Sequence, residues 1–508
     1  MDPARTYNAA VDLIDRNLAA GRGNKIAFVD DAGSTTYAQL AERVDRAANA
    51  LRGIGLKREQ RVAIVMLDSA DWVALFLGAI KAGIVPVALN TLLTAKDYEY
   101  QLNDCRARAL FYSAPLAKNL EGMQAKCPNL KYVVTEAQLN DLLASAKPKA
   151  EAAPTLRDEM CFWLYSSGST GAPKGTVHLH SHLVATADLY AKPVLGILES
   201  DVVFSAAKLF FAYGLGNSMT FPLAVGATTV LMAERPTPDS VFKRLVEKKP
   251  TIFYGVPTLY AAMLASPQFP KKSELALRVC TSAGEALPPE ILKRFTERTG
   301  AELLDGIGST EMLHIFLSNR PGDIRAGTTG KPVPGYQLRL VDEQGGVITK
   351  PGELGELQIS GPTSAIMYWS QREKTKTTFQ GPWTRSGDKY SVDEQGYYVY
   401  GGRSDDMLKV GGIWVSPAEV EAALVSHEAV LEAAVVGHED ADKLVKPKAY
   451  VVLKPGKSAT GDELKAHVKS RLAPYKYPRW IEFLGELPKT ATGKIQRFKL
   501  RAIEAGRS

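Results

Sequence analysis

Cysteine is scarce in this sequence, and its distribution excludes two kinds of site. The 508 residues include four cysteines, and no two of them are close enough for a CxxC pair. The sequence therefore offers neither a zinc ribbon nor a dithiol redox motif. Four scattered thiols in so long a chain are typical of a protein kept in a reducing compartment. The four residues are Cys105, Cys127, Cys161 and Cys280.

Long apolar runs and a secretory leader are also missing. The apolar stretch at residues 78–89 is interrupted by Lys81 and Pro86 and does not reach membrane-spanning length. The first 20 residues have no basic region followed by an apolar core, and they read as an amphipathic helix. We therefore expect a soluble protein of the cytoplasm with no membrane partner.

A strong charge of one sign is the third feature that the sequence lacks. Lys and Arg number 62 against 55 Asp and Glu, which gives a formal net charge of +7, and no long basic run carries it. A nucleic-acid binder usually concentrates positive charge in a patch or along a helix, so we expect no nucleic-acid partner. The sequence favours instead a few local sites for anionic small molecules.

What the sequence does contain is an ordinary globular composition and enough length for two or more domains. Strand-like and helix-like segments alternate through residues 25–135 and resume further along, which predicts parallel sheets covered by helices. From about residue 335 short strands with Gly turns predict a smaller β-rich subdomain. A boundary near residues 401–412 precedes a compact α+β unit. The predicted fold class is α/β, with a large N-terminal domain of several subdomains (1–404) and a small α+β C-terminal domain (405–508).

The strongest local signal is a glycine-rich run at residues 165–175, Tyr-Ser-Ser-Gly-Ser-Thr-Gly-Ala-Pro-Lys-Gly, which follows an apolar strand. Small residues let backbone N–H groups approach a polyphosphate, and the Ser and Thr hydroxyls add donors. Lys174 adds a mobile positive charge. The spacing is not that of the P-loop, in which Gly-Lys directly precedes Ser or Thr. The alternative is a flexible Gly/Ser turn without a ligand.

Two other patterns point to weaker alternatives. The Gly-x-Gly fragments at residues 214–219 and 306–311 lack the third glycine and the acidic partner of a dinucleotide site. His178, His180 and His182 do not share one helical face, and no carboxylate or thiol pattern completes a zinc site around them. We expect these histidines to form hydrogen bonds near the glycine-rich run or to be solvated.

Five further segments follow the glycine-rich run in order, although each of them alone is common. Each combines Gly with charged or hydroxyl side chains, and they lie at residues 282–288, 305–311, 383–388, 402–406 and 488–494. In this combination the chain resembles the adenylate-forming superfamily, which contains acyl-CoA synthetases, luciferases and the adenylation domains of peptide synthetases. The resemblance covers almost the whole chain. It implies an acyl-CoA synthetase-like fold, with an N-terminal AMP-binding and acyl-pocket domain and a mobile C-terminal catalytic domain.

Within the superfamily the chain looks like the benzoate–CoA ligases and their hydroxybenzoate-using relatives. The segments that carry this narrower resemblance lie at residues 205–229, 233–244, 305–319, 471–483 and 487–500. The resemblance implies an AMP-forming acid–thiol ligase that uses ATP, Mg²⁺ and CoA. It would convert benzoate or a ring-substituted benzoate such as 4-hydroxybenzoate to its CoA thioester through an acyl-adenylate, releasing AMP and pyrophosphate.

The resemblance also assigns roles in adenylation. Lys494 would bridge the carboxylate and the α-phosphate as the main catalytic cation, and Thr310 would contact the α-phosphate. Glu311 would help to hold Mg²⁺, which prefers oxygen ligands. The remaining ATP-binding residues would contact phosphates, adenine or ribose, and they are Ser166, Ser167, Gly168, Ser169, Thr170, Gly171, Lys174, Gly284, Glu285, Asp305, Gly306, Asp388 and Arg403.

The acyl site, hinge and thiol path follow from the same resemblance. A flat ring needs a narrow apolar slot, and the expected pocket residues are Ala212, Tyr213, Gly308, His314 and Ile315. Phe210, Phe211 and Phe316 flank this pocket or belong to the core. Asp405 would be the hinge about which the C-terminal domain rotates between half-reactions. Lys409, Gly411, Gly412 and Trp414 would line the pantetheine path of CoA.

Two alternative functions stay open at this stage. The chain is also compatible with a stand-alone aryl adenylation enzyme that loads a carrier protein, or with a nucleotide-binding regulatory protein whose catalysis has decayed. Retention of Lys494, Glu311 and Asp388 argues against the second. The expected partners are a small aromatic carboxylate and CoA. A lysine acetyltransferase acting on Lys494, whose charge acetylation would remove, and a second copy in a homodimer are further candidates.

Overall fold

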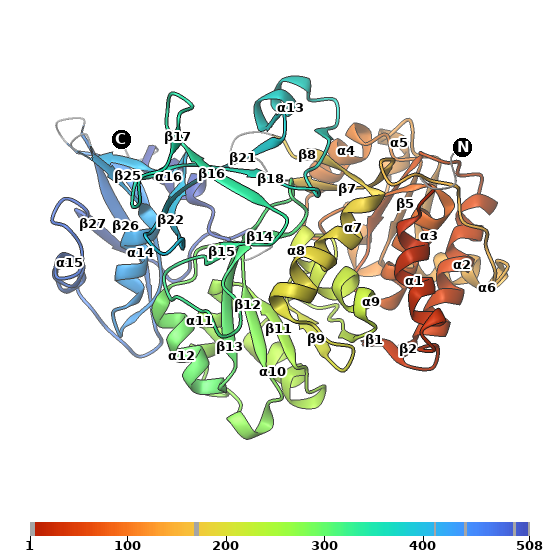
Figure 1. The fold of residues 1–508 in the computed structure, drawn as a ribbon, viewed down its shortest axis with the longest axis horizontal. Coiled ribbons are helices and arrows are strands. Elements are labelled where there is room, and N and C mark those ends of the chain that lie inside the picture. The colour runs from red at the N-terminus through yellow and green to blue at the C-terminus, as the bar shows by residue number, and fades with distance from the viewer. Residues whose placement is uncertain (1–5, 167–171, 411–412, 441–443, 491–493, 506–508) are drawn as a thin grey trace.

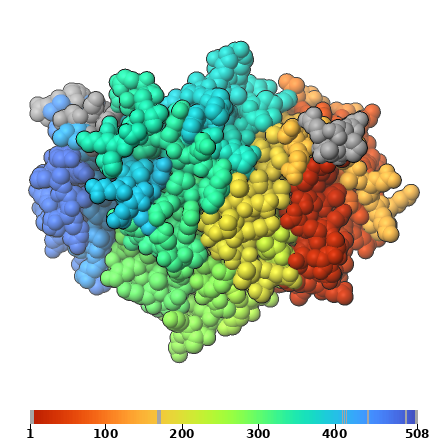
Figure 2. All heavy atoms as spheres, in the orientation of Figure 1, coloured from red at the N-terminus to blue at the C-terminus, as the bar shows by residue number. Residues whose placement is uncertain are grey.

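A computed structural model describes residues 6–166, 172–410, 413–440, 444–490 and 494–505 of the chain. The two ends of the chain lie at opposite ends of the long axis (Figure 1). The N-terminal helices form one end, the segments between residues 200 and 400 form the middle, and the C-terminal part forms the other end. The same order is visible on the surface, where the blue C-terminal part lies against green segments (Figure 2).

A seven-stranded sheet forms the N-terminal part. Its central strands are parallel, and the two strands at one edge, β8 and β19, are antiparallel to their neighbours. Helices α2 (Tyr37–Gly53) and α3 (Ala70–Ala82) pack closely, because a Cβ at Gly78 would lie 2.5 Å from the Cβ of Ala47. In order, the strands are β19 (Met367–Tyr368), β8 (Lys174–Leu179), β7 (Met160–Ser166), β4 (Val85–Ala88), β3 (Arg61–Val65), β5 (Ala109–Tyr112) and β6 (Tyr132–Thr135).

A nine-stranded sheet forms the middle of the molecule. Its central strands are parallel, so the carboxyl ends of β11, β12 and β13 lie side by side, with Ser282 paired to Gly255 on one side and Asp305 on the other. This edge is where the site begins. In order, the strands are β15 (Lys331–Pro332), β14 (Ile315–Ser318), β13 (Glu302–Gly308), β12 (Val279–Ser282), β11 (Ile252–Gly255), β9 (Val202–Ser205), β10 (Thr228–Val230), β1 (Ile26–Asp30) and β2 (Gly33–Thr36).

Helices cover the faces of these two sheets. The apolar side chains between the layers form the largest cores of the molecule, and Trp72, Phe76 and Trp163 are fully buried in them. The helices of the N-terminal and middle parts are α1 (Ala9–Ala19), α4 (Ala95–Asp104), α5 (Met123–Lys126), α6 (Glu136–Ser145), α7 (His180–Thr186), α8 (Ala212–Leu215), α9 (Phe221–Val225), α10 (Pro238–Glu247), α11 (Pro257–Ala265) and α12 (Pro289–Thr299).

A third, antiparallel sheet follows in the chain. It forms the small β-rich subdomain that the Gly-rich turns after residue 335 predict. Its strands are β17 (Val347–Ile348), β16 (Gln337–Val341), β18 (Gly355–Ser360), β21 (Trp383–Val392) and β20 (Phe379–Gln380), with β22 (Tyr398–Arg403) paired to β21 and helix α13 (Arg372–Thr378) nearby.

The C-terminal part is a separate α+β layer. Strands β23 (Leu408–Val410) and β24 (Ile413–Val415) form a hairpin, and a three-stranded sheet follows. Its own apolar core includes Val420, Val435 and Val451. The sheet is β25 (Val430–Glu439), β26 (Val445–Leu453) and β27 (Trp480–Phe483), and the helices are α14 (Pro417–Val425), α15 (Gly461–Lys469) and α16 (Arg497–Ala505).

These observations confirm the predicted fold class. Parallel sheets, a β-rich subdomain and a small α+β unit are all present, whereas the sequence alternation did not indicate the antiparallel strands at the sheet edges. The boundary between residues 404 and 405 stays a prediction. All four cysteines are buried and unpaired, and burial raises the pKa of the Cys105 thiol to about 12. Within the described ranges no helix combines the length and apolarity needed to span a membrane.

Candidate active site

The glycine-rich run connects two antiparallel strands. Ser166, the last residue of β7, pairs with Lys174, the first residue of β8, so the run lies between two paired strands. The hydroxyl of Ser166 is buried without a hydrogen-bond partner among the described residues. The predicted phosphate-binding residues Ser167, Gly168, Ser169, Thr170 and Gly171 lie outside the described residues.

Lys174 and Glu311 are linked through a tyrosine. The Nζ atom of Lys174 lies 4.2 Å from the ring centroid of Tyr368, and the Tyr368 hydroxyl donates a 2.7 Å hydrogen bond to Oε1 of Glu311. Burial lowers the pKa of Lys174, and the nearby Glu311 carboxylate opposes that shift. A cation over an aromatic face and a carboxylate on its hydroxyl form one connected unit. The structure thus places the glycine-run lysine beside the predicted metal carboxylate.

Thr310 and Glu311 lie in the turn that follows β13. The carbonyl of Thr310 accepts a 2.8 Å hydrogen bond from Nε2 of His178, and the carbonyl of Glu311 accepts one of 2.7 Å from the N–H of Ala365. Thr310 and Glu311 are partly buried, so their side chains remain within reach of a ligand. The turn therefore presents a hydroxyl and a carboxylate from a fixed backbone.

Asp388 and Arg403 face each other on adjacent strands. They are register partners of β21 and β22, and Nη1 of Arg403 lies 3.2 Å from Oδ1 of Asp388. Burial raises the pKa of Asp388, and the charges of Arg403 and Lys494 oppose the rise. Gly387 has φ of +75°, and a Cβ there would lie 2.9 Å from the Arg403 guanidinium. The glycine thus permits the close packing of this pair.

Lys494 reaches this cluster from the C-terminal part of the chain. A Cβ at Gly284 would lie 3.1 Å from Cε of Lys494, so the lysine side chain crosses the end of β12. The N–H of the next residue, Ile495, donates a 2.8 Å hydrogen bond to Oε1 of Glu285. Glu285, one of the predicted ATP-binding residues, is therefore also a contact between the two parts of the chain.

Asp305 and Gly306 occupy the end of β13. Asp305 is 7% exposed, and its Oδ1 atom is buried without a hydrogen-bond partner among the described residues. Burial raises its pKa well above the ordinary value. A buried polar atom without a partner is costly and is usually a position for a ligand or water. Asp305 and Gly284 thus lie at one sheet edge, beside Ser282, and their part in binding ATP stays a prediction.

The predicted acyl residues surround His314. The imidazole lies 5.6 Å from the ring of Tyr213 and 4.4 Å from that of Phe221. Its Nε2 atom is 3.2 Å from both the carbonyl of Tyr213 and Oδ1 of Asn217, two acceptors that require Nε2 to carry the proton. The Nδ1 atom is buried without a partner among the described residues, and burial lowers the pKa of His314 to about 3. The ring is thus neutral with one open acceptor.

Two glycines make room for this imidazole. A Cβ at Gly216 would lie 2.3 Å from Cδ2 of His314, and a Cβ at Gly308 would lie 2.6 Å from its backbone. Gly308 is also the register partner of Ile315 across β13 and β14. The structure therefore brings Tyr213, Gly308, His314 and Ile315 together, with Ala212 next to Tyr213 in α8.

The aromatic residues around this group divide into wall and core. Phe210 and Phe211 are in contact, with ring centroids 4.3 Å apart, and Phe211 is only partly buried. Phe316 is fully buried on β14 and belongs to the core. Of the three phenylalanines that the sequence left between pocket and core, Phe316 is therefore not available to a ligand.

The hinge and thiol-path predictions are only partly covered by the structure. Asp405 is exposed between β22 and β23, and the adjacent Asp406 forms a 2.5 Å ion pair with Arg501 of α16. Lys409 and Trp414 are backbone register partners of the β23–β24 hairpin, and their side chains lie outside the described part of the chain. Gly411 and Gly412 lie outside the described residues.

Sequence reasoning missed three residues of the site. Tyr368 contacts Lys174, nearly 200 residues away in the chain, and Glu311, 57 residues away. Thr281 shares a 2.5 Å hydrogen bond with the Tyr213 hydroxyl, and Asn217 contacts His314. No short motif marks them, because each acts through a long-range contact. His178, His180 and His182 belong to no metal-binding cluster: among the described residues, no three or more His, Cys, Asp or Glu side chains are grouped so that they could hold a metal ion.

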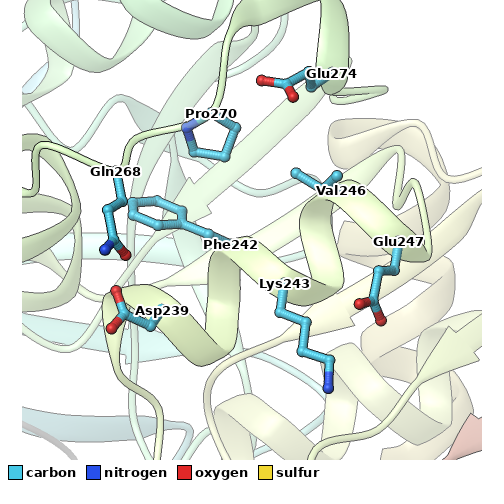
Figure 3. A pocket seen from close by; sticks show the side chains of 8 residues that line it. All are labelled: Asp239, Phe242, Lys243, Val246, Glu247, Gln268, Pro270 and Glu274. Atoms are coloured by element: carbon cyan, nitrogen blue, oxygen red, sulfur yellow. The ribbon is translucent and has the colours of Figure 1, made fainter.

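A hollow elsewhere on the surface is unrelated to this site. It has a volume of about 320 Å³, and Figure 3 shows it between α10 and the segment around Pro270. Its walls include Phe242 but are otherwise largely charged or polar side chains, and none of the predicted site residues belongs to it.

The fold, together with the glycine-rich run, the turn at residues 309–313 (the acidic turn) and a lysine from the C-terminal part, indicates an enzyme that uses a nucleotide to activate its substrate. Comparison with known families agrees, because the model described as AMP-binding enzyme matches residues 15–369 and that of the AMP-binding enzyme C-terminal domain matches residues 419–494. The chain belongs to the AMP-binding enzyme family, which confirms the resemblance to adenylate-forming enzymes.

Three relatives define its neighbourhood within the family. The benzoate–CoA ligase of Thauera aromatica is 65% identical over 505 residues, which cover 98% of this chain and 96% of that protein. The 4-hydroxybenzoate–CoA/benzoate–CoA ligase of Rhodopseudomonas palustris is 50% identical, with 99% and 95% covered. The crystal structure of a benzoate CoA ligase from Burkholderia xenovorans LB400 has a TM-score of 0.92 and 56% identity, with 97% and 100% covered.

Proposed function

We propose that this chain is an AMP-forming aryl–CoA ligase that converts benzoate to benzoyl-CoA. The observation that carries the proposal is the 65% identity to a benzoate–CoA ligase over nearly the whole of both chains. The apolar group around Tyr213 and His314, which offers one open acceptor and no fixed cation among the described residues, suits an uncharged aromatic ring.

The first step joins the carboxylate to AMP. A benzoate oxygen attacks the α-phosphorus of ATP, a new P–O bond forms, and the bond to pyrophosphate breaks. Because an anion approaches a polyanion, the step requires neutralisation of charge and alignment. Lys494 would supply the positive charge between the two reactants, and Thr310 would hold the α-phosphate. Lys174 would bind the outer phosphates, while Asp388 would accept hydrogen bonds from the ribose hydroxyls.

Mg²⁺ fits the residues at the acidic turn. The Glu311 carboxylate and the Thr310 hydroxyl are hard oxygen ligands, and no group of three or more His, Cys, Asp or Glu residues in the described ranges forms a metal cage. Mg²⁺ typically takes one or two protein carboxylates and completes its shell with phosphates and waters. Glu311 would hold it, with Oε1 oriented by Tyr368. The ion would neutralise phosphate charge.

The second step transfers the acyl group to CoA. The thiolate attacks the acyl carbon, a C–S bond forms, and AMP leaves with the electrons of the C–O bond. The position of the Lys494 side chain next to Gly284 supports its proposed part in adenylation. We propose that rotation about Asp405 then withdraws Lys494 and brings Lys409, Gly411, Gly412 and Trp414 to the thiol path.

The open Nδ1 acceptor of His314 bears on ring substituents. A 4-hydroxyl or 3-hydroxyl group on the substrate would donate a hydrogen bond to Nδ1, whereas unsubstituted benzoate would leave Nδ1 without a partner. We therefore include hydroxybenzoates among the substrates. Further parts of the proposal are a location in the cytoplasm, control by an acetyltransferase that neutralises Lys494, and assembly as a homodimer.

The experiment that tests the function measures AMP formation with ATP and Mg²⁺, with and without CoA. The acids are benzoate, 4-hydroxybenzoate, 2-aminobenzoate, cinnamate, acetate and a medium-chain fatty acid. We expect rapid, CoA-dependent turnover of the benzoates. If only the other acids were turned over, the enzyme would still be an adenylating enzyme, but the assignment of an aryl pocket would be wrong. If a thioester formed only on a carrier protein, CoA would not be the acceptor.

A further inference from the structure

Three histidines that resemble a metal site are buried, and they have different partners. His178, His180 and His182 are each at most 2% exposed. His180 accepts a hydrogen bond from the N–H of Ala9, far from the nucleotide residues in the chain. His178, in contrast, contacts the acidic turn through Thr310. Histidines of equal burial therefore serve different parts of the molecule.

The acidic turn, residues 309–313, has a backbone that needs external support. Leu313 adopts φ of +67°, an unfavourable conformation for a residue with a branched side chain, and its N–H donates to the carbonyl of Thr310 at 3.2 Å. Such a conformation persists only when its surroundings hold it in place. The turn carries Thr310 and Glu311, so its position sets where both side chains lie.

Three successive carbonyls of the turn are held by other elements. Thr310 accepts from Nε2 of His178 at 2.8 Å, Glu311 from the N–H of Ala365 at 2.7 Å, and Met312 from the hydroxyl of Thr363 at 2.8 Å. Ala365 and Thr363 come from one loop, whereas His178 comes from β8, the strand that begins at Lys174. His178 therefore connects the acidic turn to the strand that carries the glycine-run lysine.

The partners of His178 select one tautomer of its ring. A carbonyl accepts only, so Nε2 must carry the proton, and the neutral ring then has a bare Nδ1. Nδ1 of His182 lies 3.0 Å from Nδ1 of His178 and also accepts a longer hydrogen bond, of 3.4 Å, from the N–H of Leu179. The ring also stacks on Phe162, with centroids 5.2 Å apart.

We propose that His178 is a positioning residue for adenylation: its Nε2–H holds the Thr310 carbonyl so that Thr310 and Glu311 face the phosphates. The inference rests on the proposed function, because the roles of Thr310 and Glu311 belong to it. A role in packing alone makes a different prediction, since packing requires the ring and positioning requires the donor.

Two substitutions separate the donor from the ring. His178→Gln keeps an amide N–H at the position of Nε2 and loses the ring, whereas His178→Phe keeps a ring on Phe162 and loses the donor. We expect His178→Phe to lower the rate of benzoate-dependent ATP–pyrophosphate exchange roughly tenfold to a hundredfold, and His178→Gln to stay within about threefold of wild type. Thioester formation from supplied benzoyl-adenylate should change little in either variant.

The matched controls are His180→Gln and His180→Phe, which alter an equally buried ring that holds Ala9. These variants should exchange pyrophosphate at the wild-type rate. A His178→Phe enzyme as active as His178→Gln, or equal losses in the two pairs, would overturn the positioning role.

A measurement on the unmodified enzyme covers the case in which His178→Phe does not fold. The chain has only seven histidines, so ¹⁵N-histidine NMR can resolve their tautomers, with His178→Gln assigning the signal. We expect a protonated Nε2 and a bare Nδ1 on His178, and the opposite tautomer would overturn the inference. Wild-type enzyme that does not exchange pyrophosphate with benzoate would refute the proposed function, while the tautomer result would still stand.

Discussion

The hydroxyl of Tyr368 donates to Oε1 of Glu311 at 2.7 Å, and the same ring lies 4.2 Å beneath Nζ of Lys174. One buried tyrosine thus orients the predicted metal carboxylate and the glycine-run lysine together. Its N–H also donates to the hydroxyl of Thr375 in α13 at 3.0 Å, which fixes it from the other side. Tyr368 therefore connects the seven-stranded sheet, to which it belongs through β19, with the turn after β13, where we expect the phosphates to bind.

Removing that hydroxyl should weaken the use of Mg²⁺. Tyr368→Phe keeps the ring under Lys174 and loses the hydrogen bond to a charged acceptor, whose removal typically costs enough for about a tenfold to hundredfold change in rate. We expect adenylation to need a higher Mg²⁺ concentration, measured as pyrophosphate exchange over a titration of the ion. Tyr37→Phe is the control, because that buried hydroxyl donates to the carbonyl of Ala227 outside the site. Equal Mg²⁺ dependence in all three enzymes would contradict the role.

Neutralising Lys494 should separate the two half-reactions. Lys494→Gln or acetylation removes the charge between benzoate and the α-phosphate, and loss of such a stabilising group typically costs about a hundredfold to a thousandfold in rate. We expect AMP formation from benzoate and ATP to fall by that factor, while benzoyl-adenylate supplied directly still acylates CoA. Lys499→Gln, at an exposed position of α16, should leave both steps unchanged. Full adenylation by the acetylated enzyme would refute the assignment.

Adding one methyl group at Gly216 should damage the acyl pocket selectively. A Cβ there would lie 2.3 Å from the His314 ring, so Gly216→Ala must displace the imidazole or the helix around it. We expect kcat/KM for benzoate to fall by about tenfold or more, while KM for ATP stays near wild type. Gly53→Ala, where no atom lies within 4 Å of the added carbon, is the comparison. If ATP and benzoate were affected alike, the pocket assignment would fail.

Glu285 should favour the arrangement that performs adenylation. Its carboxylate accepts the N–H of Ile495, next to Lys494, across the two parts of the chain. Glu285→Ala removes this acceptor, and we expect adenylation to slow by about threefold to thirtyfold, with transfer from benzoyl-adenylate unchanged or faster. The ratio of the two half-reaction rates is the measurement. Glu419→Ala breaks an ion pair with Lys476 inside the C-terminal part and should leave that ratio alone.

Local patterns predicted the elements well, because each strand and helix follows from the spacing of its own apolar residues. The apolar run at residues 61–67 contains the buried strand β3 (Arg61–Val65), and helix α2 (Tyr37–Gly53) begins after Thr36 with the capping box that Gln39 completes. The antiparallel edges β8 and β19 were not predicted, because strand direction depends on the path of the chain between strands. Tyr368 was missed for the same reason, since it meets Glu311 only in the folded molecule.

The sequence by itself determined the family and the two-part fold and predicted the residue types of a nucleotide site, because glycine-rich runs and charged turns can be recognised along the chain. Only the tertiary structure decided how these residues act together. It brought His178 to a carbonyl of the acidic turn, and it set Lys494 beside Gly284. The physical reason is that hydrogen bonds, ring contacts and burial depend on distances in space, which residues far apart in the chain acquire only when the sheets and helices pack.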